Sequence, residues 1–135
     1  VWPRSHRERE REREMSTRAT VHFRYMGKTE AIVYRHNDGY PEGLGQDLQS
    51  FLDYLKDKVA DNRFNDPSYL ASKWVVWDSQ KYTKNNYLDF LSVGVVTEDP
   101  GDIDYRYYVD CNPEPYHIAR GAPIQDMPAI SHIEV

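Results

Sequence analysis

Residues whose side chains could bind a ligand or transfer a proton concentrate in one short stretch, residues 34–45, which reads Tyr-Arg-His-Asn-Asp-Gly-Tyr-Pro-Glu-Gly-Leu-Gly. A histidine two residues before an aspartate has the residue types of an acid–base pair. A turn that leads into a helix also presents amide N–H groups that can bind an anion. The candidate site residues are Arg35, His36, Asp38, Tyr40, Glu42 and Gly43.

Three interpretations of this stretch, which we call the junction, compete. In the structural one, Asp38 caps a turn, Arg35 or His36 contacts Glu42, and the glycines permit tight backbone geometry. In the second, His36, Tyr40 and the helix N-terminus bind an anionic or hydrogen-bonding ligand or a partner loop. In the third, the junction is a catalytic or metal site, but no H-E-x-x-H, G-x-G-x-x-G, G-x-x-x-x-G-K-[ST] or G-x-S-x-G motif occurs. The sequence therefore assigns no catalytic residue, no metal ligand and no cofactor.

The elements around the junction must position it. Residues 19–25 alternate between apolar and polar side chains, which predicts a half-buried strand, and residues 30–36 form its antiparallel partner after a turn at Gly27-Lys28. The helix after the junction is predicted from one apolar stripe, and its start, at Pro41 or after Gly43, is left open. The stripe consists of Leu44, Leu48, Phe51, Leu52, Leu55 and Val59.

A second helix is predicted from a cap-then-proline signal at Asp66-Pro67 and runs to about residue 78. Its candidate buried side chains are Leu70, Trp74 and Trp77. The Trp-Val-Val-Trp core of this segment is rich in strand-forming residues, so a strand is the alternative interpretation.

The last third of the chain predicts further strands. Residues 88–97 form one, with Gly94 as a candidate bulge. Asp99-Pro-Gly-Asp is a strong turn signal, so residues 103–110 are expected to return as the antiparallel partner. Residues 116–120 are expected to add a short edge strand.

The resulting order, β-β-α-α-β-β-β, predicts an α+β fold in which helices cover one face of a largely antiparallel sheet. We expect residues 1–18 to be a flexible, charged N-terminal extension, residues 19–120 to form a single domain, and residues 121–135 to be a C-terminal tail. Arg and Glu alternate in the extension, and Met15-Ser-Thr-Arg has the form of a natural start. We therefore expect the preceding residues to be an added or upstream segment.

Charge and composition narrow the classes of function. The chain has a formal net charge of −5, and because residues 1–18 carry +2, the remainder carries −7. An acidic domain disfavours nucleic acid as a partner, since phosphate contact requires Lys and Arg. Tyr105, Tyr107 and Tyr108 invite comparison with strands that stack bases, but the interleaved aspartates favour core and cross-strand packing instead.

The sequence also bears on the compartment. No apolar run approaches the roughly 20 residues that span a bilayer, and no signal segment is present, so we expect no membrane partner. The single cysteine, Cys111, excludes an internal disulfide and fits a reducing compartment. Together these features predict a cytoplasmic protein.

The junction and its surroundings resemble a group of small bacteriophage, bacterial and archaeal proteins with an M-S-T-R start and the pattern Y-x-H-x-D-G-Y-P-E-G at the junction. The resemblance covers most of residues 15–120, including the Asp-Pro-Ser-Tyr-Leu-Ala and Tyr-Arg-Tyr-Tyr-Val segments. It implies a phage or mobile-element context and no particular activity. The Arg/Glu extension departs from the pattern.

The leading functional hypothesis is a non-catalytic protein-binding module of phage or mobile-element origin that acts on host machinery through the junction and the acidic surface. Its partner is then a host protein or a second copy of the chain, in a homodimer. The alternative hypothesis is a binder or hydrolase of a phosphorylated or nucleotide-like small ligand, which uses His36, Asp38 and Tyr40. A third hypothesis is a DNA mimic, which predicts two rows of acidic side chains at phosphate-like spacing.

Overall fold

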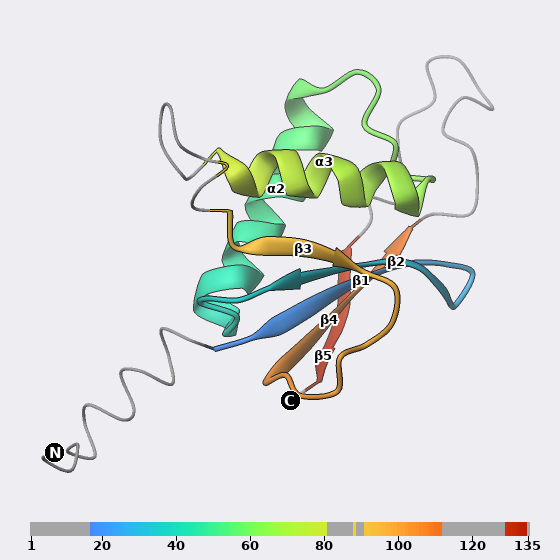
Figure 1. Cartoon of the computed structure of the whole chain (residues 1–135). Helices are drawn as coiled ribbons and strands as arrows, with labels where there is room; N and C mark the ends of the chain where they lie inside the picture. Colours follow the sequence, from blue (N-terminus) through green and yellow to red (C-terminus); the bar gives the residue numbers. More distant parts are fainter. Residues whose placement is uncertain (1–16, 81–87, 89–90, 112–128, 135) are drawn as a thin grey trace, which may run out of the picture.

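The computed structural model describes residues 17–80, 88, 91–111 and 129–134 of the chain (Figure 1). The order of its elements confirms the predicted α+β fold, and a single π-helical turn, η1, leads into the first long helix. The elements are β1 (Ala19–Tyr25), β2 (Lys28–Arg35), η1 (Pro41–Gly45), α2 (Gln46–Lys58), α3 (Pro67–Ser79), β3 (Val93–Val96), β4 (Tyr105–Cys111) and β5 (Ala129–Glu134).

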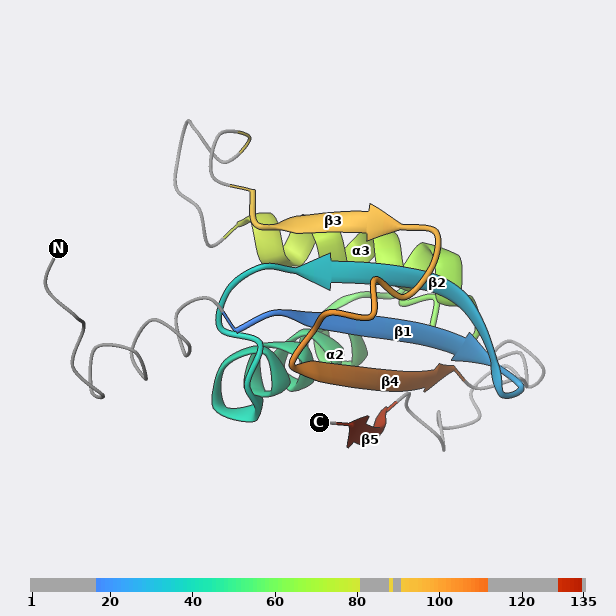
Figure 2. The ribbon, with the colours of Figure 1, turned by 60° about the horizontal axis from the view of Figure 1, so that its bottom comes forward.

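The strands form one mixed sheet in the order β3-β2-β1-β4-β5. Strand β4 lies parallel to β1, and the other pairings are antiparallel. Helices α2 and α3 cover one face of the sheet, while residues 97–104, which connect β3 to β4, cross β2 and β1 on the other face (Figure 2). This other face, which carries the side chains of Thr20, His22, Arg24, Arg106 and Tyr108, is called the open face below.

The predicted hairpin between residues 88–97 and 103–110 is wrong. The turn chemistry at Asp99 exists, because the Gly101 amide donates to Asp99 Oδ1 over 2.7 Å. The chain nevertheless continues across the sheet, and β4 pairs with the central strand β1. That placement puts Tyr107 and Val109 of β4 in the core beneath the helices. The register between β2 and β3 is also regular, so the bulge expected at Gly94 does not form.

The expected C-terminal tail over residues 121–135 is also wrong in part, because Ala129–Glu134 forms β5 at the edge of the sheet. In its register with β4, Tyr107 lies opposite Ile133 and Val109 lies opposite Ile130. The two isoleucines are three residues apart, not two, because an extra residue is accommodated where the register shifts. This irregularity hides the strand from a search for strict alternation. The edge strand expected at residues 116–120 lies outside the described residues.

The folded part of the chain begins before the expected boundary at residue 19. Thr17 is buried, and its carbonyl accepts a hydrogen bond of 3.0 Å from the Gly39 amide. The backbone of Arg18 exchanges hydrogen bonds with Asp104, through its own amide to the carboxylate and through its carbonyl to the Asp104 amide. These two residues therefore belong to the domain and not to a flexible extension.

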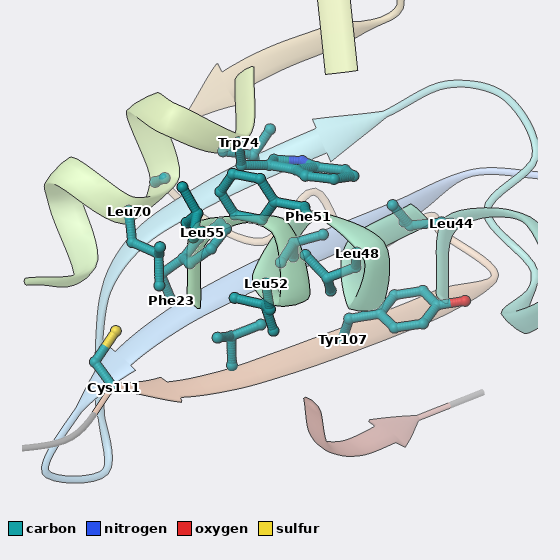
Figure 3. Close-up of a cluster of buried hydrophobic side chains, with 14 of the residues drawn as sticks. Phe23, Leu44, Leu48, Phe51, Leu52, Leu55, Leu70, Trp74, Tyr107 and Cys111 are labelled. Carbon is teal, nitrogen blue, oxygen red and sulfur yellow. The ribbon is translucent and has the colours of Figure 1, made fainter. Parts of the chain in front are cut away.

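The hydrophobic core lies between the sheet and the two helices (Figure 3). Five of the six side chains of the predicted stripe are buried, namely Leu44, Leu48, Phe51, Leu52 and Leu55. The sixth, Val59, follows the end of α2 and is partly buried against the core. The ambiguous segment after residue 66 is a helix. At the N-terminus of this helix, α3, the Asp66 side chain accepts a hydrogen bond from the Tyr69 amide. Trp74 of α3 is completely buried. The helix interpretation is favoured physically because Leu70 and Trp74, four residues apart, then lie on one face.

Candidate functional site

The centre of the junction is a tight backbone turn. Asp38 has a left-handed conformation, with φ of 56°, and its carbonyl accepts the Leu44 amide at 2.9 Å. A Cβ at position 43 would lie 2.5 Å from that same carbonyl oxygen, so only glycine fits there. The Gly43 amide donates to the Tyr40 carbonyl. Because the amides of Gly43 and Leu44 are used within the turn, neither is available to the anion that the sequence suggested.

The turn is fixed to the sheet through Gly39. Besides the bond from its amide to Thr17, its carbonyl accepts a hydrogen bond of 2.6 Å from the hydroxyl of Tyr107 on β4. A Cβ at this position would lie 2.7 Å from Cβ of Ala19. Burial raises the pKa of the Tyr107 hydroxyl, which therefore stays protonated and remains a donor. The part of the junction from Asp38 to Gly43, called the inner junction below, thus holds β1, β4 and η1 together.

Arg35, the last residue of β2, points toward the helices. Its side chain is 3% exposed, and its Nη1 lies 2.9 Å from Oδ2 of Asp47 on α2 and 3.3 Å from Oδ1 of Asp78 on α3. Asp78 is completely buried. The guanidinium therefore joins the end of β2 to both helices, and burial in this ion triad leaves it little access to an external ligand.

The other candidate residues divide between the turn and the surface. Tyr40 immediately precedes η1 and is half-buried, whereas Glu42 is exposed in its first turn. His36 is exposed beyond the end of β2, and its Nδ1 is hydrogen-bonded over 2.8 Å to the hydroxyl of Tyr34. The structure thus brings His36 together with Tyr34, while Asp38 is held by its backbone in the turn.

A shallow hollow of about 390 Å³ opens beside His36, at the edge of the sheet. Tyr34 and Gly94 are directly paired across β2 and β3 at its floor, and Ser92 accepts the His36 amide beside them. The lining residues are Tyr34, His36, Asn37, Leu91, Ser92, Val93 and Gly94. Three junction residues, Tyr34, His36 and Asn37, therefore contribute to a surface depression whose walls are aromatic, polar and aliphatic.

A larger hollow of about 480 Å³ lies between α2 and α3, where the sequence indicated no site. We call it the helix groove. Its apolar side chains reach the surface, since Tyr54 is 47%, Tyr69 54% and Val76 59% exposed. The rings of Tyr54 and Trp77 contact each other across the groove, with centroids 5.0 Å apart. The lining residues are Phe51, Tyr54, Leu55, Val59, Tyr69, Ser72, Lys73, Val76, Trp77 and Gln80.

One sequence signal could have indicated the helix groove. Tyr69 and Val76 lie seven residues apart on α3, on a different side of the helix from the buried pair Leu70 and Trp74. One apolar stripe is enough for α3 to pack on the core, and the second apolar pair therefore indicates an additional apolar surface on this helix. The predicted core position Trp77 lies between the two stripes, partly buried against the core and partly lining the groove.

The open face carries a network of charges around the chain crossing. Arg106 forms a two-pronged ion pair with Asp99 of the connection, and Arg24 forms one with Asp110, at 2.7 and 2.9 Å. Arg24 also lies over the ring of Tyr108 at 4.7 Å. Among the described residues of the open face, arginines therefore offset Asp99 and Asp110, which disfavours these two carboxylates as unopposed phosphate mimics.

His22 lies beneath this connection and is only 5% exposed. Its Nε2 is hydrogen-bonded to Thr20 Oγ1 at 2.9 Å and lies 3.6 Å from Asp99 Oδ2, and its ring stacks on Tyr108. Burial lowers the pKa of His22, and the Asp99 carboxylate only partly opposes this effect. The neutral imidazole is therefore the form that the fold favours.

The buried His22 makes stability depend on pH. Its pKa in the folded chain lies below the ordinary value of 6.5, so the unfolded chain takes up the proton first as the pH falls. The stabilisation of the folded chain by neutral His22 is fully present above pH 6.5. It is lost as the pH falls from there through the lower pKa that His22 has in the folded chain. Urea unfolding between pH 8 and pH 5 should show this loss, and His22→Gln, which cannot titrate, should flatten the curve. An unchanged slope in the variant would assign the pH dependence to other groups.

Within the described residues, no three His, Cys, Asp or Glu side chains cluster in a way that could hold a metal ion. Neither of the described α-helices is long and apolar enough to cross a membrane. The chain matches no protein-family model, no curated protein and no solved structure.

Proposed function

We propose that the protein is a non-catalytic protein-binding module that takes up an apolar segment of its partner in the helix groove. The observation that carries this proposal is the exposure of Tyr54, Tyr69 and Val76 around one continuous hollow. Large apolar side chains are ordinarily withdrawn from water, and a surface that gathers them beside partly buried aromatic rings is typical of an interface.

The chemistry of the groove favours a protein segment over a small polar ligand. The aromatic side chains offer large contact areas and lose little side-chain entropy on binding. Lys73 is the only charged side chain among the described residues that line it. A fitting segment therefore presents apolar side chains to Tyr54 and Trp77 and a carboxylate to Lys73, as one face of an amphipathic helix can do.

The partner that we propose is a host protein. This part of the proposal depends on the resemblance of the junction to small phage and prokaryotic proteins, which implies a phage or mobile-element origin. The groove supports the binding of a protein segment whether or not that origin holds.

Val76→Asp tests the groove directly. Val76 is 59% exposed, so the substitution should leave the fold intact and change the free energy of unfolding by no more than about 0.5 kcal/mol. A carboxylate inside an apolar interface should nevertheless weaken binding by about tenfold or more. Immobilised wild-type chain would first capture a partner from host lysate, and calorimetry with the purified partner would then give each variant's affinity.

Met26→Asp is the matched control, because Met26 is 78% exposed in the turn between β1 and β2, away from the groove. It should bind as the wild type does. A partner that binds the Val76 and Met26 variants equally well would refute binding through the groove. Lys73→Glu adds a check on the partner's charge, since it should weaken binding only if an acidic group of the partner meets Lys73.

A further inference from the structure

Strand β3 forms one edge of the sheet, and no other strand of the described chain pairs with its outer side. Its sequence, Val-Gly-Val-Val, contains no charge and no proline, and its register with β2 is regular. The opposite edge strand, β5, carries Glu134 and an irregular register, which are features that discourage pairing with another strand. The two edges therefore differ, and only β3 has the character of an open template.

The direction of the backbone groups on β3 follows from its pairing. The His36 amide donates to the Ser92 carbonyl, so these two residues form a hydrogen-bonded pair. Along antiparallel strands, hydrogen-bonded pairs alternate with pairs that are not hydrogen-bonded. The pair of Arg35 and Val93 is therefore not hydrogen-bonded, and the pair of Tyr34 and Gly94 is. The N–H and C=O groups of Val93 and Val95 therefore point away from β2, toward the outer side of the edge.

Gly94 has no evident role within the described chain. Glycine weakens a strand interior, and it usually marks a strained backbone or a close approach. Yet Gly94 has no positive φ, and none of the described atoms lies within 4 Å of where its Cβ would be. The missing side chain instead keeps the hollow beside Tyr34 and His36 open.

We propose that the β3 edge binds an extended peptide segment of a partner protein by strand addition, with one peptide side chain seated over Gly94 in the hollow. The backbone groups of Val93 and Val95 would supply the hydrogen bonds, and the hollow would select the side chain. This surface goes beyond the helix groove and does not depend on it.

The hollow indicates the chemistry of that side chain. Its walls are the hydrogen-bonded rings of Tyr34 and His36, together with Leu91 and the polar Asn37. A flat aromatic ring with a polar edge fits these walls best. The neighbouring peptide side chains, which alternate to the other face, would pack beside the 76% exposed Val95 and should be apolar.

A partner peptide fits this edge better than a second copy of β3. In a two-fold antiparallel pairing of two β3 strands centred on Gly94, glycine would lie opposite glycine. The pairing would then satisfy the backbone but leave the hollow beside Tyr34 and His36 without a side chain.

The test uses the full chain and a display library of random linear dodecapeptides as the probe. Peptides selected on the wild type should share an aromatic residue flanked by alternating apolar positions.

Val95→Pro removes an outward N–H without removing a hydrogen bond between β3 and β2, and it should weaken binding about tenfold or more. Val95→Thr keeps that N–H and should bind normally. Gly94→Val should fold and also bind about tenfold more weakly, because its side chain fills the hollow.

Amide hydrogen exchange gives an independent readout. In the free protein the Gly94 amide should be protected and that of Val95, which is 76% exposed, should exchange quickly, and a bound peptide should protect both.

The proposal is overturned if no peptide is enriched, if enriched peptides bind the Gly94 and Val95→Pro variants as well as the wild type, or if the Val95 amide stays unprotected. A concentration-dependent dimer that Val95→Pro dissociates would also overturn it, because the occupant would then be a second copy. None of these results would affect binding at the helix groove, which the Val76 variant tests.

Discussion

Replacement of Asp78 by alanine is expected to lower the free energy of unfolding by about 3–5 kcal/mol. Asp78 is completely buried at the end of α3, and its Oδ1 lies 3.3 Å from Nη1 of Arg35, which is itself 3% exposed. Without Asp78, the guanidinium remains buried, and among the described residues its remaining ion-pair partner is the partly exposed Asp47. Urea unfolding followed by far-ultraviolet circular dichroism measures the loss.

Two further variants separate the buried ion pair from a general effect of losing an aspartate. Asp57→Ala removes an exposed carboxylate from α2 and should change the free energy of unfolding by no more than about 0.5 kcal/mol. Arg35→Met combined with Asp78→Ala removes both buried charges, so the double variant should be more stable than Asp78→Ala alone. A double variant that is less stable than the sum of the two single effects would contradict a role based on charge compensation.

Gly39→Ala is expected to destabilise the fold by about 3 kcal/mol, the upper end of the range for inserting a methyl group into a packed site. The added Cβ would lie 2.7 Å from Cβ of Ala19 and 2.9 Å from the Thr17 carbonyl oxygen, and neither neighbour is a flexible side chain. Gly39 has no positive φ, so the cost comes from contact and not from backbone conformation. Thermal and urea unfolding provide the measurement.

Gly94→Ala is the control for this substitution, because its new Cβ would meet nothing within 4 Å among the described atoms. It should leave stability unchanged or raise it by about 0.4–1 kcal/mol through the lower entropy of the unfolded chain. If Gly39→Ala were as mild as Gly94→Ala, the junction would have room to relax, and its role as a rigid scaffold between β1 and β4 would be refuted.

The elements that the sequence predicted well are those fixed by neighbouring residues. The stripe of α2 depends on residues three and four positions apart, and the start of α3 depends on the Asp66 side chain and the proline beside it. The first hairpin is likewise local. In each case the residues that decide the structure lie within a few positions of one another, so a search along the chain finds them.

The errors concern choices among distant segments. The turn at Asp99 is real, but nothing near it specifies whether β4 returns to β3 or crosses to β1. That choice depends on the core, where Tyr107 and Val109 fit beneath α2. Strand β5 lacks the two-residue alternation by which a strand is found in a sequence. Its isoleucines are three residues apart, because the strand has an extra residue where its register with β4 shifts.

The candidate site was predicted in part for the same reason. The left-handed conformation of Asp38 and the need for glycine at position 43 are local, and they agree with the tight turn of the structural interpretation. The contact of Arg35 or His36 with Glu42 that this interpretation expected is replaced by ion pairs of Arg35 with Asp47 and Asp78 and by the bond of His36 to Tyr34. The burial of Arg35 could not be foreseen, because its partners Asp47 and Asp78 come from two later helices. The helix groove exists only once α2 and α3 lie side by side, so the second apolar pair on α3, Tyr69 and Val76, indicates an exposed apolar side of that helix but not what lies opposite it.

The parallel pairing of β1 with β4 has a consequence for the chain during its synthesis. Arg24 and its ion-pair partner Asp110 are separated by 86 residues, and the other β1–β4 partners are equally distant. The ribosome must therefore release most of the domain before the central strand meets its second neighbour. Until then one side of β1 offers an unpaired edge, so the nascent chain should depend on chaperones more than the finished protein does, and its folding should be slow for its size.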